Sequence, residues 1–205
     1  MHTDTDRFVT FVVDDDKSVL RSLSRLLATE GYEVRPYSRA DQFLAEHDAS
    51  IPGCAILDMS MPDLNGLELQ DALAAIKSDR PIIFLSGVAE VPASVRAMKA
   101  GAIDFLTKPV RSEDLLAAVE VARNKQAKDR GQQEERDIAH TRLARLTPRE
   151  RQVMVGVVAG KLNKQIAADL DISLKTVKLH RGTMMRKMGV RAVADLVRLA
   201  ELARN

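Results

Sequence analysis

The sequence predicts a doubly wound α/β domain with a five-stranded parallel sheet, followed by an all-α domain. Short apolar strands alternate with amphipathic helices over the first 123 residues, and such alternation is typical of a parallel sheet with helices on both faces. After Leu146 every apolar pattern has helical spacing. We therefore divide the chain into domains at residues 1–123 and 143–205. The polar stretch between them, residues 124–142, is expected to be a charged, helix-forming linker.

The elements of the first domain follow from its apolar segments. Amphipathic patterns between the strands predict helices, the first of which ends at Gly31 and the last of which begins near Ser112. In the linker, Gly131 is expected to interrupt a helix. The predicted strands are residues 8–13, 34–37, 54–57, 82–85 and 103–106.

Four helices are expected in the second domain. Thr147–Glu150 has the pattern of a capping box with proline at the first helical position, and Gly160 ends that helix. Asn163 and Ser173 are candidate caps of two further helices, the second of which reaches Met188. A fourth helix is expected over residues 191–202.

Charge is divided unevenly along the chain. Residues 1–124 carry 13 Lys and Arg against 20 Asp and Glu, whereas residues 143–205 carry 13 against 5. The stretch 125–142 is nearly neutral, with 5 against 4. This split indicates different partners for the two ends, and the basic end favours nucleic acid.

Composition argues against a disulfide-stabilised or membrane protein. The chain has a single cysteine, Cys54, which lies in an apolar setting. Residues 1–10 contain no apolar run like that of a signal peptide. No apolar stretch approaches the roughly 20 residues that cross a bilayer. We expect a soluble, cytoplasmic protein with no membrane partner.

Polar side chains stand at or just after the ends of the predicted strands. Asp14, Asp15, Asp58 and Lys108 should therefore meet at one edge of the sheet. Three carboxylates together repel one another, and a hard divalent cation such as Mg²⁺ relieves that repulsion. Lys108 supplies a charge for a phosphoryl oxygen, and Ser86 is placed to donate a hydrogen bond to it. The set suits phosphoryl transfer to a carboxylate.

These segments together resemble the receiver domain of bacterial response regulators, over about residues 6–123. The resemblance implies the flavodoxin-like receiver fold. The matching segments are Val12–Asp16 for the acidic pocket, Ile56–Gly66 around the phosphorylated aspartate, Leu85–Gly87 for the switch hydroxyl, and Ala100–Pro109 for the fifth strand with its lysine and cis proline.

The resemblance assigns roles to the acidic residues. Asp58 would be the phosphoacceptor, and its phosphodonor would be a partner sensor histidine kinase. Asp15 and Asp58 would bind Mg²⁺ directly, together with the backbone carbonyl of Ser60. Asp14 would hold a metal-bound water.

The remaining receiver residues would read the phosphorylation state. Lys108 would contact the phosphoryl group, and Ser86 and Phe105 would form the switch pair. Val88 departs from the histidine of many relatives, which affects the expected lifetime of the phosphorylated form. The protein would not be an enzyme for an external substrate, although a receiver catalyses its own phosphorylation and dephosphorylation.

The basic end resembles the LuxR-type helix-turn-helix over roughly residues 143–203. The helix after Ser173 would enter the major groove of DNA. Gly182 departs from the Lys, Arg or Ala common at its position, which leaves site preference open. The matching segments are Leu146–Arg151, Gly160–Ala167 and Ser173–His180. The predicted DNA-contacting residues are Asn163, Lys164, Lys175, Thr176, Lys178, Leu179, Arg181 and Gly182.

Taken together, the two domains resemble the FixJ/NarL class of transcriptional regulators, closer to FixJ. The implied partners are the histidine kinase, double-stranded promoter DNA, a second copy of the chain after phosphorylation, and RNA polymerase. The sequence does not distinguish activation from repression.

Two alternatives stay open at this point. An aspartate-based phosphatase also uses carboxylates, Mg²⁺ and lysine, and Asp14 and Asp16 fit the spacing of its nucleophile motif. A degenerate receiver that binds DNA without phosphorylation is the second alternative.

Overall fold

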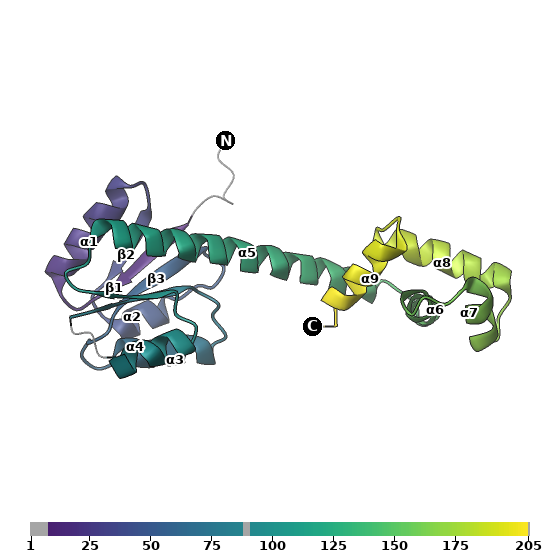
Figure 1. The fold of residues 1–205 in the computed structure, drawn as a ribbon, viewed down its shortest axis with the longest axis horizontal. Helices are drawn as coiled ribbons and strands as arrows, with labels where there is room; N and C mark the ends of the chain where they lie inside the picture. Colours follow the sequence, from purple (N-terminus) through teal and green to yellow (C-terminus); the bar gives the residue numbers. More distant parts are fainter. Residues whose placement is uncertain (1–7, 88–90, 205) are drawn as a thin grey trace. The chain divides into compact units, whose positions relative to one another are not determined.

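Five parallel strands form one sheet in the order β2-β1-β3-β4-β5 (Figure 1). The structure is a computed structural model that describes residues 8–87 and 91–204. The bounds of every strand differ from the predicted ones by at most one residue, and the predicted α/β fold is confirmed. The strands are β1 Val9–Val13, β2 Glu33–Tyr37, β3 Gly53–Asp58, β4 Ile82–Ser86 and β5 Asp104–Thr107.

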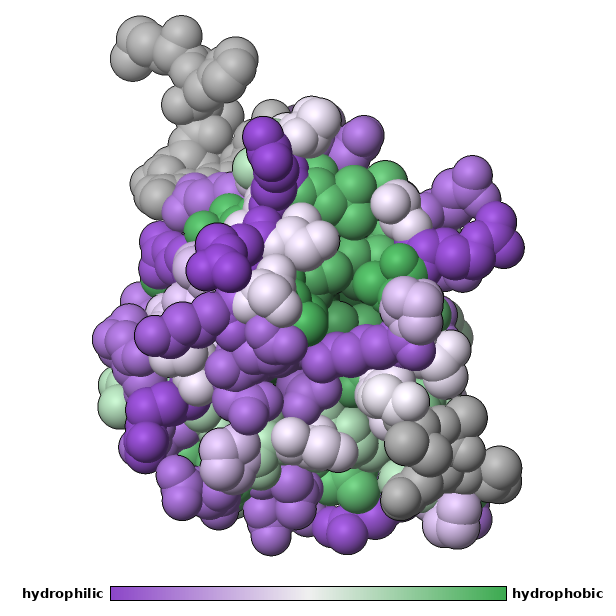
Figure 2. Space-filling model, turned by 90° about the vertical axis from the view of Figure 1, so that its left-hand side faces the viewer, coloured by the Kyte–Doolittle hydropathy of each residue, from purple (hydrophilic) through white to green (hydrophobic). Residues whose placement is uncertain are grey.

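Two layers of helices cover the sheet. The first layer lies on one face of the sheet and the second on the other (Figure 1). Each layer buries apolar side chains against its face. Seen in Figure 2, the exposed surface is mainly hydrophilic, with hydrophobic side chains gathered in its upper part. The first layer is α1 Lys17–Thr29 and α5 Ser112–Ala144, and the second is α2 Ala40–Ala45, α3 Gly66–Ala75 and α4 Val91–Lys99.

Helix α5 is longer than the sequence predicted. It continues through Gly131, so the expected break there is wrong. A single glycine costs a helix only about 1 kcal/mol, and the Gln, Glu, Lys and Arg residues around Gly131 favour helix. Long as α5 is, no helix in residues 8–87 and 91–204 has the apolar length that a bilayer crossing requires.

The chain divides into two compact units, and the boundary falls between Lys128 and Asp129. Gln126 belongs to the first unit, where only 4% of it is exposed. Its Oε1 atom accepts a hydrogen bond of 2.6 Å from the backbone N–H of Gly53. A side chain at Gly53 would place its Cβ 2.0 Å from the carbonyl oxygen of Val9. The start of β3 is thus held on one side by β1 and on the other by α5.

The second unit packs four helices and the end of α5 around one apolar core. Its fourth helix begins two residues later than predicted, because Ala192 is still extended, with φ −105° and ψ 150°. The helices are α6 Pro148–Val158, α7 Asn163–Asp169, α8 Leu174–Met188 and α9 Val193–Leu202. The core residues include Leu146, Val153, Val157, Ile166, Val177, Met184, Met188, Leu196 and Leu199.

A buried carboxylate ties the start of α6 to the end of α8. The predicted capping box is present, since Glu150 Oε2 accepts a hydrogen bond from the Thr147 N–H at 2.8 Å. The same oxygen lies 2.7 Å from Lys187 Nζ. These contacts, that with Lys187 first, lower the pKa of Glu150, which keeps it ionised.

A buried arginine, Arg80, lies in the first unit just before β4. The guanidinium carbon of Arg80 lies 4.3 Å from the centre of the Phe11 ring, and its Nη2 donates to the Asp48 carbonyl at 2.7 Å. Nearby, His47 packs edge-on against Phe43. Neither ring nitrogen of His47 has a hydrogen-bond partner within the described part of the chain. Burial, and then the charge of Arg80, lower the pKa of His47.

We predict that His47 makes the first unit sensitive to mild acid. The unfolded chain titrates His47 near pH 6.5, and the folded chain binds that proton less readily. The free energy of unfolding of the first unit should therefore decrease as the pH falls below about 6.5, because the unfolded state binds more protons than the folded state. Denaturant unfolding of wild type and His47→Gln from about pH 7 to about pH 5 checks this. The wild type should lose more stability than the variant, and parallel curves would contradict the prediction.

Candidate functional site

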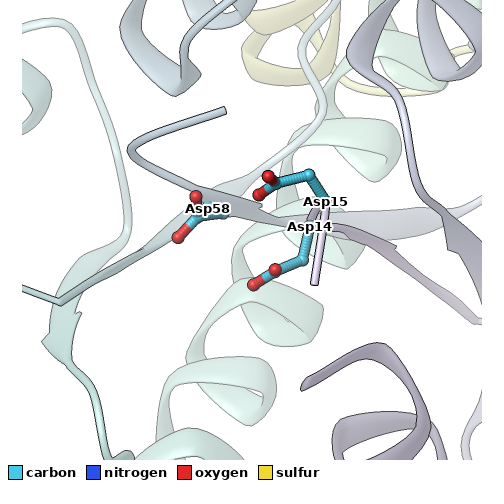
Figure 3. A group of neighbouring side chains, drawn as sticks. All are labelled: Asp14, Asp15 and Asp58. Atoms are coloured by element: carbon cyan, nitrogen blue, oxygen red, sulfur yellow. The ribbon is translucent and has the colours of Figure 1, made fainter. Parts of the chain in front are cut away.

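Three aspartates gather at the carboxyl edge of the sheet. Asp14 and Asp15 follow β1, and Asp58 is the last residue of β3, the neighbouring strand. The register pairs Val13 with Leu57, so the next residue of each strand reaches the same edge. One carboxylate oxygen from each aspartate lies within 4.8 Å of those of the other two (Figure 3). The sequence prediction that these three residues meet is confirmed by this geometry.

Lys108 balances the charge of two of these aspartates. Its Nζ lies 2.6 Å from Asp14 Oδ2 and 2.7 Å from Asp58 Oδ1. Burial lowers the pKa of the Lys108 ammonium, but the contacts with Asp14 and Asp58 outweigh burial, so its pKa is raised. Burial raises the pKa of Asp14, and Lys108 and the Asp16 N–H oppose that effect only in part. The bond between Lys108 and Pro109 is cis, as the resemblance implied.

The aspartates line a cleft of about 330 Å³. The backbone N–H of Ser60 donates to Asp58 Oδ2 at 2.9 Å, and Ser86 lies buried at the end of β4. Carboxylate oxygens suit a hard cation, and an ammonium with nearby hydroxyls suits a phosphoryl group. The other residues that line the cleft are Asp16, Met59, Gly87 and Ala93.

Phe105 lies in β5, beside the strand that carries Ser86. The register pairs Phe105 with Phe84, and the two ring centres are 6.3 Å apart. Phe105 is partly buried against the core on the α2–α3–α4 face of the sheet. It therefore lies between the core and the surface. Val88, the predicted departure in the next loop, lies outside the described residues.

Helices α7 and α8 form the helix-turn-helix. Asp171 in the turn has φ of 52°, a left-handed conformation that aspartate tolerates better than most residues. Ser173 caps α8 by accepting a hydrogen bond of 3.0 Å from the Thr176 N–H. A side chain at Gly156 of α6 would place its Cβ 2.8 Å from Ile166 of α7, so glycine allows the close packing that supports α8.

The predicted DNA-contacting residues fall into two groups. The first group is exposed: Lys164, Lys175, Lys178, Leu179 and Gly182. The second group is half-buried and engaged within the unit. Arg181 Nη1 donates to Asn163 Oδ1 at 2.6 Å, and the hydroxyls of Thr176 and Ser173 are 2.7 Å apart. Sequence spacing alone did not reveal these pairs, nor the contact of Lys187 with Glu150 described above.

Comparison with known families decides the identity of both units. Residues 10–120 match the family described as Response regulator receiver domain. Residues 144–200 match the family described as Bacterial regulatory proteins, luxR family. The chain belongs to the response regulators. The FixJ/NarL-type combination of a receiver with a LuxR-type helix-turn-helix is therefore confirmed.

Similar proteins share both domains of this response regulator. The response regulator protein TmoT of Ectopseudomonas mendocina is 43% identical over 200 residues, which are 98% of this chain and 91% of TmoT. The solved structure of the response regulator StyR is 43% identical, with a TM-score of 0.87, and the match covers 95% of this chain and 98% of that one. Full-length FixJ from B. japonicum is 37% identical, with a TM-score of 0.59 over 97% of this chain and 98% of that one.

The position of Asp16 argues against the phosphatase alternative. Asp16 Oδ1 accepts hydrogen bonds from the backbone N–H of Ser18 at 2.7 Å and from its hydroxyl at 2.6 Å. Asp16 therefore caps α1, and its carboxylate is engaged there.

Proposed function

We propose that this response regulator accepts a phosphoryl group on Asp58 from a sensor histidine kinase, dimerises, and binds promoter DNA to regulate transcription. The observation that carries the proposal is the meeting of Asp58, two further carboxylates and the Lys108 ammonium in one cleft. The same chain carries a LuxR-type helix-turn-helix.

Asp58 is the proposed nucleophile. An Asp58 oxygen attacks the phosphorus of a phosphohistidine, the P–N bond breaks, and the histidine nitrogen leaves with the bonding electrons. An acyl phosphate forms on Asp58. Lys108 and the Ser60 N–H already hold the two oxygens of the carboxylate, so little reorganisation is required. Lys108 would then pair with a phosphoryl oxygen, and Ser86 would donate to another.

Receiver domains use Mg²⁺, and the acidic cluster fits it. Asp15, Asp58 and the backbone carbonyl of Ser60 would bind the ion directly, and Asp14 would hold a water of its shell. The support is that three carboxylates offer hard oxygen ligands within 4.8 Å of one another. Bound there, Mg²⁺ would neutralise charge on the phosphoryl oxygens.

We predict Mg²⁺-dependent phosphorylation at Asp58. Incubation with acetyl phosphate should add one phosphate to wild type, and intact-mass spectrometry measures it. Asp58→Asn should remain unlabelled at this position. Asp16→Asn is the matched control, because asparagine also caps a helix and labelling should persist. Equal, Mg²⁺-independent labelling of wild type and Asp58→Asn would contradict the proposal and favour the degenerate-receiver alternative.

Helix α8 is the proposed recognition helix. Lys175 and Thr176 stand in its first turn, where a phosphate is also favoured by the helix dipole. Lys178, Leu179 and Gly182 would face base edges. Their exposure supports this, whereas Arg181 would support α7 through Asn163. Lys164 would add a phosphate contact, and RNA polymerase would be the next partner of the promoter-bound dimer.

We predict that DNA binding is strongly salt-dependent. The 13 Lys and Arg of residues 143–205 face only 5 Asp and Glu. Affinity of the full chain for duplex DNA should fall roughly tenfold or more when salt rises from about 0.1 M to about 0.2 M. Lys178→Ala should reduce discrimination between sequences, and Lys175→Ala should weaken all sequences alike. Fluorescence anisotropy titrations measure both, and binding that salt leaves unchanged would count against the assignment.

Phosphorylation would be communicated through Ser86 and Phe105. Movement of the Ser86 hydroxyl toward the phosphoryl group vacates space that the Phe105 ring can fill. The surface formed by α4, β5 and α5 then changes shape and becomes the dimer interface. A dimer presents two recognition helices. Once one of them has bound its half-site, the other is held at high effective concentration near the second half-site, which raises the affinity for the whole site.

We predict that beryllofluoride, a phosphoryl mimic, converts the protein from mostly monomer to dimer. Sedimentation velocity measures the change. Phe105→Ala should stay monomeric although beryllofluoride still occupies its site, because the variant lacks the ring that fills the vacated space. Asp58→Asn is the control without the acceptor. A mass that stays constant in wild type at confirmed occupancy would refute this coupling.

A further inference from the structure

Gly182 lies in the interior of α8, and no contact within the described chain requires a glycine at this position. Glycine costs a helix interior about 1 kcal/mol relative to alanine. Apart from its two chain neighbours and the adjacent backbone of α8, a Cβ built on Gly182 meets no atom of the described chain within 4 Å. Gly156 is different, because its Cβ would collide with Ile166. The space beside Gly182 is therefore open for something that the chain itself does not supply.

The open space lies on the outward face of α8. Val177, Met184 and Met188 are buried and define the inward face. At 3.6 residues per turn, the opposite face is occupied in turn by Lys175, Leu179, Gly182 and Arg186, all of them exposed. Leu179 is 68% exposed. A leucine so placed adds little to folding, since most of its apolar surface stays in water.

Leu179 and Gly182 together form an apolar notch between cations. Lys175 precedes it by one turn and Arg186 follows it by one turn, so a polyanion is drawn to both sides. In the notch itself there is no side-chain donor or acceptor, and glycine lets the partner approach the helix backbone. The partner must therefore present an apolar group within an anionic surface.

We infer that this notch receives the C5 methyl group of a thymine in the major groove. That methyl is the apolar group which the major groove offers, and aliphatic side chains recognise it by contact. Leu179 supplies the contact, and Gly182 supplies the room. The inference rests on the proposed function, because it requires that α8 enter the major groove. It makes Leu179 and Gly182 specificity-determining residues, each of them contacting the base.

Replacement of thymine by deoxyuridine tests the notch directly, because it removes the methyl group and preserves base pairing. Duplexes are first selected from a randomised pool by the full-length chain in the presence of beryllofluoride. Each thymine of a selected duplex is then replaced in turn. One thymine in each half-site should lose about fourfold in affinity, as expected for one buried methyl group of roughly 0.8 kcal/mol. The other thymines should show little change.

Two variants assign that loss to the notch. Leu179→Ala should bind the thymine and deoxyuridine duplexes equally well at the sensitive position. Gly182→Ala fills the notch and should also bring the affinity ratio close to one. Because alanine improves the helix, Gly182→Ala should melt at a higher temperature than wild type, which excludes misfolding as the cause.

Gly131→Ala is the matched control. Gly131 is a second helix-interior glycine, in α5, and its surroundings are also open. This variant should keep the fourfold ratio of wild type. A selected site in which no thymine is sensitive would overturn the inference while leaving DNA binding intact. A full penalty retained in Leu179→Ala or Gly182→Ala would also overturn it. Failure to enrich any sequence would overturn both the inference and the proposed function.

Discussion

The contact of one lysine with two aspartates organises the functional edge of the receiver. Asp14 and Asp58 are 1% and 5% exposed, and carboxylates buried so deeply repel each other unless a cation intervenes. Lys108 provides that cation from the far side of β4, because it directly follows β5, which is two positions away from β3 in the sheet. Only a long, flexible stem reaches that far. The strand order, the buried carboxylates and the length of lysine therefore depend on one another.

The sequence carried most of the information about the fold, because the central strands are continuous apolar runs separated by amphipathic helical patterns. In parallel strands covered on both faces, every residue of β1, β3 and β4 is buried, and a continuous apolar run reveals them. Helix ends were harder to predict. Gly131 has the pattern of a helix break, but its neighbours outweigh it, and Ala192 delays α9 although no local signal marks it. Where each helix continues or begins depends on the conformational preferences of several neighbouring residues together rather than on one residue.

The candidate site was predictable to the extent that strand ends position it. Asp58 ends a strand, and Asp14, Asp15 and Lys108 follow strand ends, so sheet topology alone brings them together. The helix-turn-helix was less predictable at the level of atoms. Arg181 meets Asn163, and Lys187 meets Glu150, across 18 and 37 residues of sequence. A count of basic residues treats Arg181 and Lys187 as surface groups, and only the packing of α6, α7 and α8 shows that both are engaged.

The hydrogen bond between Gln126 and Gly53 has a consequence for how such proteins can be cut and recombined. Strand β3 begins at Gly53, which donates its N–H to Gln126 of α5, and ends at Asp58 of the acidic cluster. The contact with α5 and the acidic cluster therefore lie at opposite ends of one strand. A receiver excised after residue 123 would lose the acceptor for the Gly53 N–H and leave that buried group unsatisfied. Chimeric sensors that graft this receiver onto a foreign output domain should therefore make the junction after Lys128, and preserve the helical phase of α5 beyond it.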